Sequence, residues 1–211
     1  MIAVVDYGIG NLHSAHKAFD RLGADARLTA DAAEIAAADA VVLPGVGAFG
    51  ACMRELRAAN LEGPVLDAVA SGRPFLGICI GMQMLFSSSE ENPDVAGLGV
   101  IPGVIRWIPP GVKRPQMQWN QVHLGDAPDP LFADLGTAPW FYFVHSLHGV
   151  PDDPSVVVGT CDYGGPVNVA FRSQNVVAVQ FHPEKSARAG LRLLGNFVQS
   201  ASIPTATAGT R

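Results

Sequence analysis

One cysteine lies where a turn of the chain could make it a nucleophile. Cys79 has Gly77 two positions before it and Gly81 two positions after it. An apolar run typical of a buried strand leads into this segment, and a helix-like apolar run follows. Small neighbours allow a sharp turn, and unpaired N–H groups at a helix start favour the thiolate, which attacks carbonyl carbon. We therefore predict a nucleophile elbow at Cys79; the alternative is a small buried core residue.

A late histidine and carboxylate could supply the other groups that a reactive thiol needs. Such a thiol requires a base, and the base usually requires a third group to orient it. His182 follows an apolar strand predicted over 176–181, and Glu184 stands two residues later, across the stiff Pro183. Taken singly, the two fit an exposed turn histidine and an acid at a helix start. Together with the elbow they predict a triad of Cys79, His182 and Glu184.

A glycine-rich loop over 43–50 could turn backbone N–H groups toward a ligand. It follows a predicted buried strand and carries Gly45, Gly47 and Gly50 around Pro44. Two N–H groups from such a loop could stabilise the oxyanion that forms when a thiolate attacks an amide carbonyl. A turn without a ligand remains the alternative, because glycine-rich loops are common after strands in α/β proteins.

Composition excludes several classes of function. The net charge is −5, charged residues make up 16%, and Lys and Arg form no run, so nucleic acid and anionic membranes are not expected partners. The cysteines at positions 52, 79 and 161 are odd in number and lack metal-ligand spacing, which predicts neither a zinc site nor a disulfide framework. The N-terminus does not resemble a signal peptide, and no apolar run reaches membrane-spanning length. We therefore expect a cytoplasmic protein.

Strand and helix patterns alternate through the first half of the chain. Strands are predicted over 2–6, 24–28, 40–43 and 73–79, and helices over 12–22, 31–38, 51–59, 61–71 and directly after Cys79. The alternation predicts an α/β fold, a single domain over 1–200 with a mostly parallel sheet and helices on both faces. The glycines of the first loop, Gly8 and Gly10, lack the third glycine of a dinucleotide motif and predict a tight turn.

The alternation stops in the second half. A polar turn is predicted over 87–93, a glycine-interrupted strand over 97–108, strands over 140–144, 156–160, 167–171 and 176–181, and a helix over 190–200. Short strands without intervening helices predict antiparallel pairing in the C-terminal half. The tail over 201–211, rich in Thr and Ala, is predicted to be disordered.

Three motifs, in this order along the chain, resemble the class I (triad) glutamine amidotransferases. They are Pro44-Gly45-Val46-Gly47, Gly77-Ile78-Cys79-Ile80-Gly81-Met82-Gln83 and His182-Pro183-Glu184. Narrower marks, at 5–12, 45–50, 119–120, 143–146 and 184–186, resemble the glutaminase subunits of imidazole glycerol phosphate synthases. The resemblance covers about residues 2 to 198.

The resemblance implies an activity and a partner. Glutamine would be hydrolysed to glutamate and ammonia through a thioester on Cys79, with His182 as general base and then acid, and Glu184 orienting it. The ammonia would pass to a TIM-barrel cyclase subunit in a heterodimer, which makes imidazole glycerol phosphate and AICAR in histidine biosynthesis. No cofactor and no metal are implied.

The resemblance also assigns the remaining site residues. The oxyanion loop would comprise Gly45, Val46 and Gly47, with the N–H groups of Val46 and Ile80 as donors. The substrate would contact Gln83 and the backbone of Ser146 and Leu147. The partner interface would include Asn11, Trp119, Asn120 and Lys185. The partner's ligand could bias the orientation of the oxyanion loop and so suppress wasteful hydrolysis.

The chain departs from the family pattern at a few positions. Gln116 and Gln118 replace the histidine and the glycine of Pro-His-Met-Gly-Trp-Asn, which puts in question the local interface geometry and the backbone at 118. The residues after Ser146, including His148, replace two aromatics that relatives often carry. We expect His145 and His148 to be structural or rim residues, because neither has an adjacent orienting acid.

Three alternative functions remain. Glutaminase components for anthranilate, carbamoyl phosphate or GMP synthesis share the triad, although the compact length and the start Asp6-Tyr7-Gly8 favour the histidine pathway. A non-catalytic interaction subunit would have no need of Cys79, His182 and Glu184. A peptidase or stress protein with an elbow cysteine would leave the late His-Pro-Glu motif unexplained.

Overall fold

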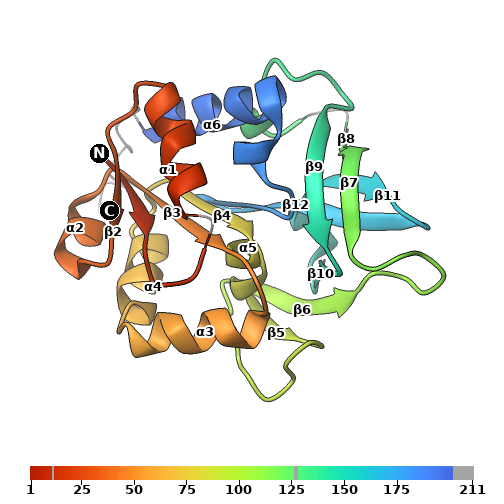
Figure 1. Cartoon of the computed structure of the whole chain (residues 1–211), viewed down its shortest axis with the longest axis horizontal. Coiled ribbons are helices and arrows are strands. Elements are labelled where there is room, and N and C mark those ends of the chain that lie inside the picture. The colour runs from red at the N-terminus through yellow and green to blue at the C-terminus, as the bar shows by residue number, and fades with distance from the viewer. Residues whose placement is uncertain (11, 126–127, 202–211) are drawn as a thin grey trace, which may run out of the picture.

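An eight-stranded mixed sheet carries the residues of the predicted site (Figure 1). The computed structural model describes residues 1–10, 12–125 and 128–201. The strands lie in the order β2 (Ala26–Thr29), β1 (Ile2–Val5), β3 (Ala40–Gly45), β4 (Phe75–Cys79), β13 (Val176–Val179), β12 (Pro166–Ser173), β11 (Val157–Asp162) and β8 (His123–Leu124). The first five pair in parallel and the last three pair antiparallel. The predicted α/β fold, with antiparallel strands in the C-terminal half, is confirmed.

Helices cover both faces of this sheet. They are α1 (Leu12–Arg21), α2 (Ala32–Ala37), α3 (Phe49–Ala58), α4 (Glu62–Ala70), α5 (Ile80–Met84) and α6 (Ala187–Ala201), with 3-10 turns η1 (Pro130–Phe132), η2 (Pro154–Val156) and η3 (Pro183–Lys185). Figure 1 places α1 and α6 on one side of the sheet and α3, α4 and α5 on the other. The buried positions 190, 193, 194 and 197 of α6 repeat with helical spacing, so one stripe of that helix faces the core.

The junction between α3 and α4 departs from the usual effect of a Gly-Pro pair. The break between α3 and α4 falls at Asn60, which has a φ of 57°, but Gly63 and Pro64 lie inside α4. Proline is tolerated there because the first helical turn has no intrahelical partner for its N–H. The expected interface residue Asn11 and residues 202–211 of the predicted tail lie outside the described residues.

Two small sheets form the wall beside the site. One has the order β10 (Leu147–Pro151), β6 (Ile101–Trp107), β5 (Phe86–Ser89), and the other pairs β7 (Gln116–Gln121) with β9 (Trp140–His145). The polar turn predicted over 87–93 is therefore wrong in its first half. Ser88 and Ser89 pair in parallel with β6, and this pairing outweighs the turn preference of a serine run.

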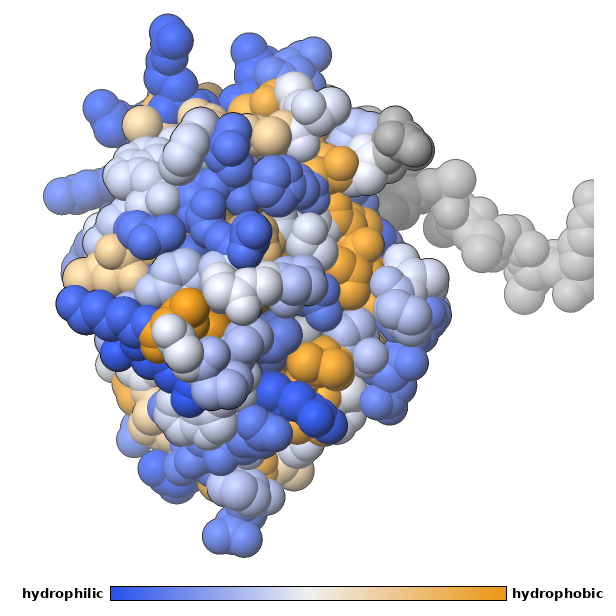
Figure 2. All heavy atoms as spheres, turned by 90° about the vertical axis from the view of Figure 1, so that its right-hand side faces the viewer, coloured by the Kyte–Doolittle hydropathy of each residue, from blue (hydrophilic) through white to orange (hydrophobic). Residues whose placement is uncertain are grey.

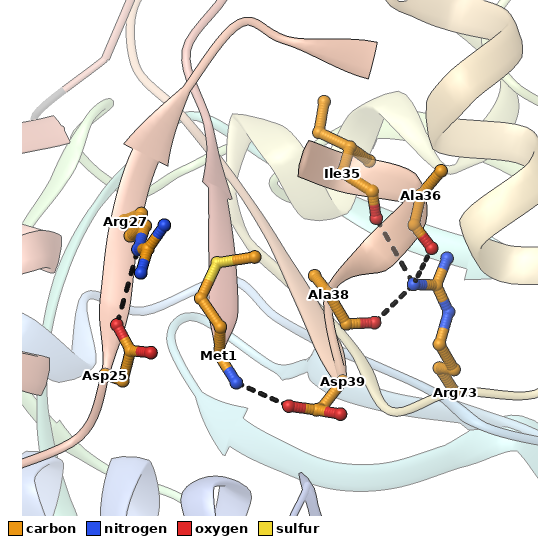
Figure 3. A network of polar contacts seen from close by, with 8 residues as sticks. All are labelled: Met1, Asp25, Arg27, Ile35, Ala36, Ala38, Asp39 and Arg73. Carbon is orange, nitrogen blue, oxygen red and sulfur yellow. Dashed lines mark hydrogen bonds and ion pairs between the residues drawn. The ribbon is translucent and has the colours of Figure 1, made fainter. Parts of the chain in front are cut away.

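Arg73 closes the C-terminal end of α2 just before β4 begins. Its guanidinium donates to the carbonyls of Ile35 (3.2 Å), Ala36 (2.8 Å) and Ala38 (Figure 3). The last turn of α2 contains no basic residue of its own, so Arg73 supplies the positive charge that a helix C-terminus favours. The contact ties the corner between α2 and β3 to the strand that ends at Cys79.

We expect Arg73→Gln to lower the free energy of unfolding by about 1–2 kcal/mol, because three helix-end carbonyls lose a charged donor. Urea denaturation followed by circular dichroism measures the change. Arg73→Lys is the matched control and should lose less, since lysine keeps the charge but not the planar fork. A Gln variant that unfolds at the wild-type midpoint would contradict the role of this contact.

Candidate active site

Cys79 sits at a strained turn between β4 and α5. Its φ and ψ are 56° and −113°, a region that non-glycine residues rarely occupy and that costs about 1–3 kcal/mol. The turn brings two backbone segments so close together that only glycine fits at Gly45 and Gly81. A Cβ on Gly81 would overlap the carbonyl oxygen of Leu43 and lie 2.7 Å from its carbon, and a Cβ on Gly45 would lie 2.8 Å from the Gly81 nitrogen. This backbone is the predicted elbow.

His182 and Glu184 reach the elbow from the neighbouring strand. β13 pairs in parallel with β4, so its continuation runs past Cys79. His182 Nδ1 lies 2.8 Å from Glu184 Oε1, and both side chains are at most 5% exposed. Burial acts to lower the pKa of His182, but hydrogen bonds to Cys79 and Glu184 outweigh it and raise the pKa to about 10. The ring is therefore an imidazolium at neutral pH, stabilised by its contacts with Cys79 and Glu184.

We expect Glu184→Gln to lower the pKa of His182, because it removes a negative charge 2.8 Å from Nδ1. The wild-type value of about 10 exceeds the ordinary 6.5, so protonation of the folded state adds stability that is complete below pH 6.5 and lost as pH rises through 10. In the variant this stability is lost at lower pH. NMR titration of the His182 ring measures its titration midpoint in wild type and in the variant. Equal midpoints would show that Glu184 does not stabilise the positive charge on the ring.

A cavity of about 630 Å³ opens beside Cys79. It is lined by Gly10, Val46, Gly47, Cys79, Ile80, Gln83, Glu91, Pro115, Val144, His145, Ser146, Leu147, His182 and Lys185. Gly45 and Glu184 line a smaller void behind it. The structure thus gathers the predicted triad, oxyanion and substrate residues in one place. It places Lys185, predicted for the interface, at the cavity, and Trp119 and Asn120 on β7 outside it.

Two buried donors hold the oxyanion loop from behind. Tyr7 Oη donates to the Pro44 carbonyl at 2.8 Å, and Cys52 Sγ donates to the Val46 carbonyl at 3.3 Å. Burial raises the pKa of both Tyr7 and Cys52, so both groups stay protonated at neutral pH. The two carbonyls flank the Gly45–Val46 peptide. The backbone that was predicted to offer the Val46 N–H is therefore fixed on each side.

Sequence reasoning missed two residues of the site, Glu91 and Gln180. Glu91 lines the cavity, and its Oε2 accepts from the Phe49 N–H at 2.8 Å, which caps α3. Gln180 is fully buried, with Nε2 3.8 Å from Cys79 Sγ. A polar residue inside the apolar run over 176–181 was a signal for Gln180. No signal in the sequence pointed to Glu91.

The substituted residue Gln116 lies behind the cavity wall. It is fully buried, and its Oε1 lies 2.8 Å from Nε2 of His145, whose Nδ1 lies 2.7 Å from the Leu147 carbonyl. Burial lowers the pKa of His145 to about 4. Gln116 therefore supports the cavity wall through its contact with His145. Of the two residues that depart from the family pattern, Gln116 and Gln118, only Gln118 is exposed. The buried ring, held between the Leu147 carbonyl and Gln116, fits the structural role expected for His145.

The described part of the chain contains no cluster of three His, Cys, Asp or Glu side chains placed to hold a metal ion. Its cysteines, at positions 52, 79 and 161, are free and buried. None of its helices combines the length and the apolar character that a membrane crossing requires.

Comparisons with known proteins agree with this geometry. The family model "Glutamine amidotransferase class-I" matches residues 3–201. Proteins named imidazole glycerol phosphate synthase subunit HisH are similar: that of Synechococcus elongatus is 52% identical over 93% of this chain and 92% of its own, and that of Syntrophotalea carbinolica is 50% identical over 93% and 98%. A solved glutamine amidotransferase shares the fold, with a TM-score of 0.76 and 20% identity over 96% of this chain and 100% of its own. The chain belongs to the class I glutamine amidotransferase family.

Proposed function

We propose that the protein hydrolyses glutamine to glutamate and ammonia and delivers the ammonia to a cyclase partner in histidine biosynthesis. The observation that carries this proposal is the buried Cys79–His182–Glu184 arrangement at one cavity. Membership of the amidotransferase family and relatives about half identical favour this pathway over anthranilate, carbamoyl phosphate or GMP synthesis. A cytoplasmic location stays a prediction.

The reaction would proceed in two halves. The Cys79 thiolate attacks the side-chain carbonyl of glutamine, and N–H groups of Val46 and Ile80 hold the oxyanion. His182 gives its proton to the leaving nitrogen, the C–N bond breaks, and ammonia departs from a thioester. The neutral ring then takes a proton from water, the hydroxide attacks the thioester, and the thiolate leaves as glutamate forms. Glu184 keeps the ring oriented throughout.

The cavity offers complementary groups for the rest of the substrate. Glu91 places a carboxylate at the wall, which suits the α-ammonium group, and Lys185 is an exposed cation at the same cavity, which suits the α-carboxylate. Gln83 and the backbone of Ser146 and Leu147 complete the wall. A free amino acid with a terminal amide fits this distribution of charge.

The proposed partner is a TIM-barrel cyclase that binds as the second subunit of a heterodimer and converts the ammonia into imidazole glycerol phosphate and AICAR. Ammonia released into water would be protonated, so the two active sites must face each other. Three large side chains on β7 and β9 are exposed: Met117 (62%), Trp119 (43%) and Trp140 (52%). Figure 2 shows this side of the molecule as largely hydrophilic with small separate apolar groups. We therefore expect exposed aromatic side chains to anchor the partner.

We expect Trp119→Ala to weaken cyclase binding about 10-fold to 100-fold, because a buried aromatic anchor is lost from the interface. Titration calorimetry with the purified cyclase measures the change. Trp107→Ala is the matched control, since Trp107 is similarly exposed (41%) but lies on β6. Equal affinities of the two variants would remove Trp119 from the interface. Asn120 is a poorer probe, because its Nδ2 already donates to the Asp162 carbonyl at 2.9 Å.

The decisive experiment follows nitrogen from glutamine to product. Glutamine labelled with ¹⁵N in its side-chain amide is supplied to the protein alone, with the cyclase, and with the cyclase and its nucleotide ligand. We expect label in imidazole glycerol phosphate only with the cyclase, and faster glutamate release when the ligand is added. If no glutamate forms in any mixture, the proposed activity is wrong. If the rate of glutamate release is the same with and without the cyclase and its ligand, the proposed switch in the oxyanion loop is wrong.

A further inference from the structure

Gln180 lies between the sulfur of Cys79 and the side chain of Gln83. Its Nε2 is 3.8 Å from Cys79 Sγ, and its Oε1 accepts a hydrogen bond from Gln83 Nε2 at 3.0 Å. Gln180 is fully buried and Gln83 is 1% exposed. The two amides therefore connect the nucleophile to the cavity wall along a path separate from His182 and Glu184.

The backbone holds Gln180 in this position. Its N–H donates to the Val169 carbonyl at 2.9 Å, just beyond the end of β13. Phe181 points into an aromatic cluster, where its ring stacks on Phe141 with centroids 4.0 Å apart. Gln180 and His182, on either side of Phe181, both contact the sulfur of Cys79.

The charge on the sulfur determines how both amides are oriented. A thiolate can only accept hydrogen bonds, so it selects the NH₂ end of Gln180. The Gln180 oxygen then faces Gln83 and must itself accept, so it selects the NH₂ end of Gln83. The side-chain oxygen of Gln83 then takes no part in this chain of hydrogen bonds. It is buried and has no hydrogen-bond partner among the described residues, on a side chain that lines the cavity.

An unpaired buried amide oxygen is costly, so this atom requires a donor. Glutamine brings N–H donors at its α-ammonium group and at its side-chain amide. We propose that Gln180 binds the Cys79 thiolate directly and that this contact fixes Gln83 so that its oxygen accepts a hydrogen bond from the substrate. Gln180 is thus a positioning residue for both nucleophile and substrate; the substrate half of this inference rests on the proposed function.

The thiolate half is tested on the full chain without glutamine. The rate of alkylation by iodoacetamide is measured against pH for wild type, Gln180→Leu and Gln180→Glu. We expect alkylation at neutral pH to be about tenfold slower in the Leu variant, because a hydrogen bond to the sulfur is gone, and slower still in the Glu variant, which adds a negative charge beside it. Gln199→Leu, an exposed glutamine on α6, is the matched control. Cys79→Ala protein gives the background from Cys52 and Cys161, which are buried.

Gln180→Glu nearly preserves the shape of the side chain, so it keeps the test valid if the Leu variant fails to fold. Alkylation profiles of the Leu and Glu variants that coincide with the wild type would overturn the proposal. Glutamine kinetics test the second half: Gln180→Leu should raise KM as well as lower kcat, because Gln83 loses the group that orients it, and an unchanged KM would overturn that half. Absence of hydrolysis by wild type would defeat the proposed function while leaving the alkylation result standing.

Discussion

Replacing Cys79 by alanine is expected to lower glutamine hydrolysis at least about 10⁴-fold, because loss of a nucleophile removes the covalent route and leaves only binding and oxyanion stabilisation. An amide is a poor electrophile, and the imidazolium of His182 has no thiolate to pair with in this variant. Glutamate release in the presence of the cyclase is the measurement. Binding of the cyclase should persist, since Cys79 is buried at the cavity and is not among the exposed side chains of β7 and β9.

The matched control is Cys161→Ala, which removes a free buried thiol on β11 that does not line the cavity. Burial raises the pKa of Cys161 to about 12, so it is no nucleophile at neutral pH. We expect this variant to keep its turnover. Activity that survives in Cys79→Ala would show that another group attacks the substrate, and the mechanism would have to be abandoned.

Gly81→Ala is expected to destabilise the protein by at least about 3 kcal/mol, because the new methyl overlaps main-chain atoms that cannot move without breaking the sheet. The atoms in question belong to Leu43, which is paired with Gly77 in the centre of the parallel sheet. Relief would have to come from the turn itself, so the Cys79 backbone would shift and hydrolysis would fall as well. The urea midpoint and the glutaminase rate measure the two effects.

Gly195→Ala makes the same chemical change with the opposite expectation. Gly195 lies inside α6, and an added Cβ would lie 3.8 Å from Leu22 Cδ2, an ordinary van der Waals contact, so alanine should stabilise the helix by about 0.5–1 kcal/mol. A Gly81→Ala protein as stable as the wild type would show that the turn tolerates a side chain. In that case the close approach of Leu43 would not be the reason that position 81 carries glycine.

The parts of the site that local sequence could predict are those with local causes. The elbow at Cys79 follows from two glycines between a strand pattern and a helix pattern, and the triad from a stiff His-Pro-Glu turn after an apolar strand. The alternation of strands and helices likewise predicted the parallel half of the sheet. The elbow, the His182–Glu184 pair and the strand–helix units each form within a short segment, whereas the meeting of this pair with Cys79 was inferred from their joint occurrence.

The parts that sequence could not predict depend on contacts between distant segments. The partners of Tyr7 and Cys52 on the oxyanion loop, and of Glu91 on α3, are set by how loops pack. Gln180 stood out as a polar residue in an apolar run, but its contact with Cys79, 101 residues earlier, depends on the pairing of β13 with β4. The two small sheets were missed for the same reason, since β5 becomes a strand only because β6 lies beside it.

The place of β13 in the sheet has a consequence for the activity of the chain during its synthesis. This strand lies between β4 and β12, so the edge of β4 that carries Cys79 stays unpaired until nearly the whole chain has left the ribosome. At about 5–20 residues per second, the segment between Cys79 and Gln180 takes at least several seconds to synthesise. During that interval the sulfur has neither His182 nor Gln180 beside it. A nascent chain is therefore unable to release ammonia. Pairing of β13 with β4 joins the two parts of the sheet and brings His182 and Gln180 beside the Cys79 sulfur.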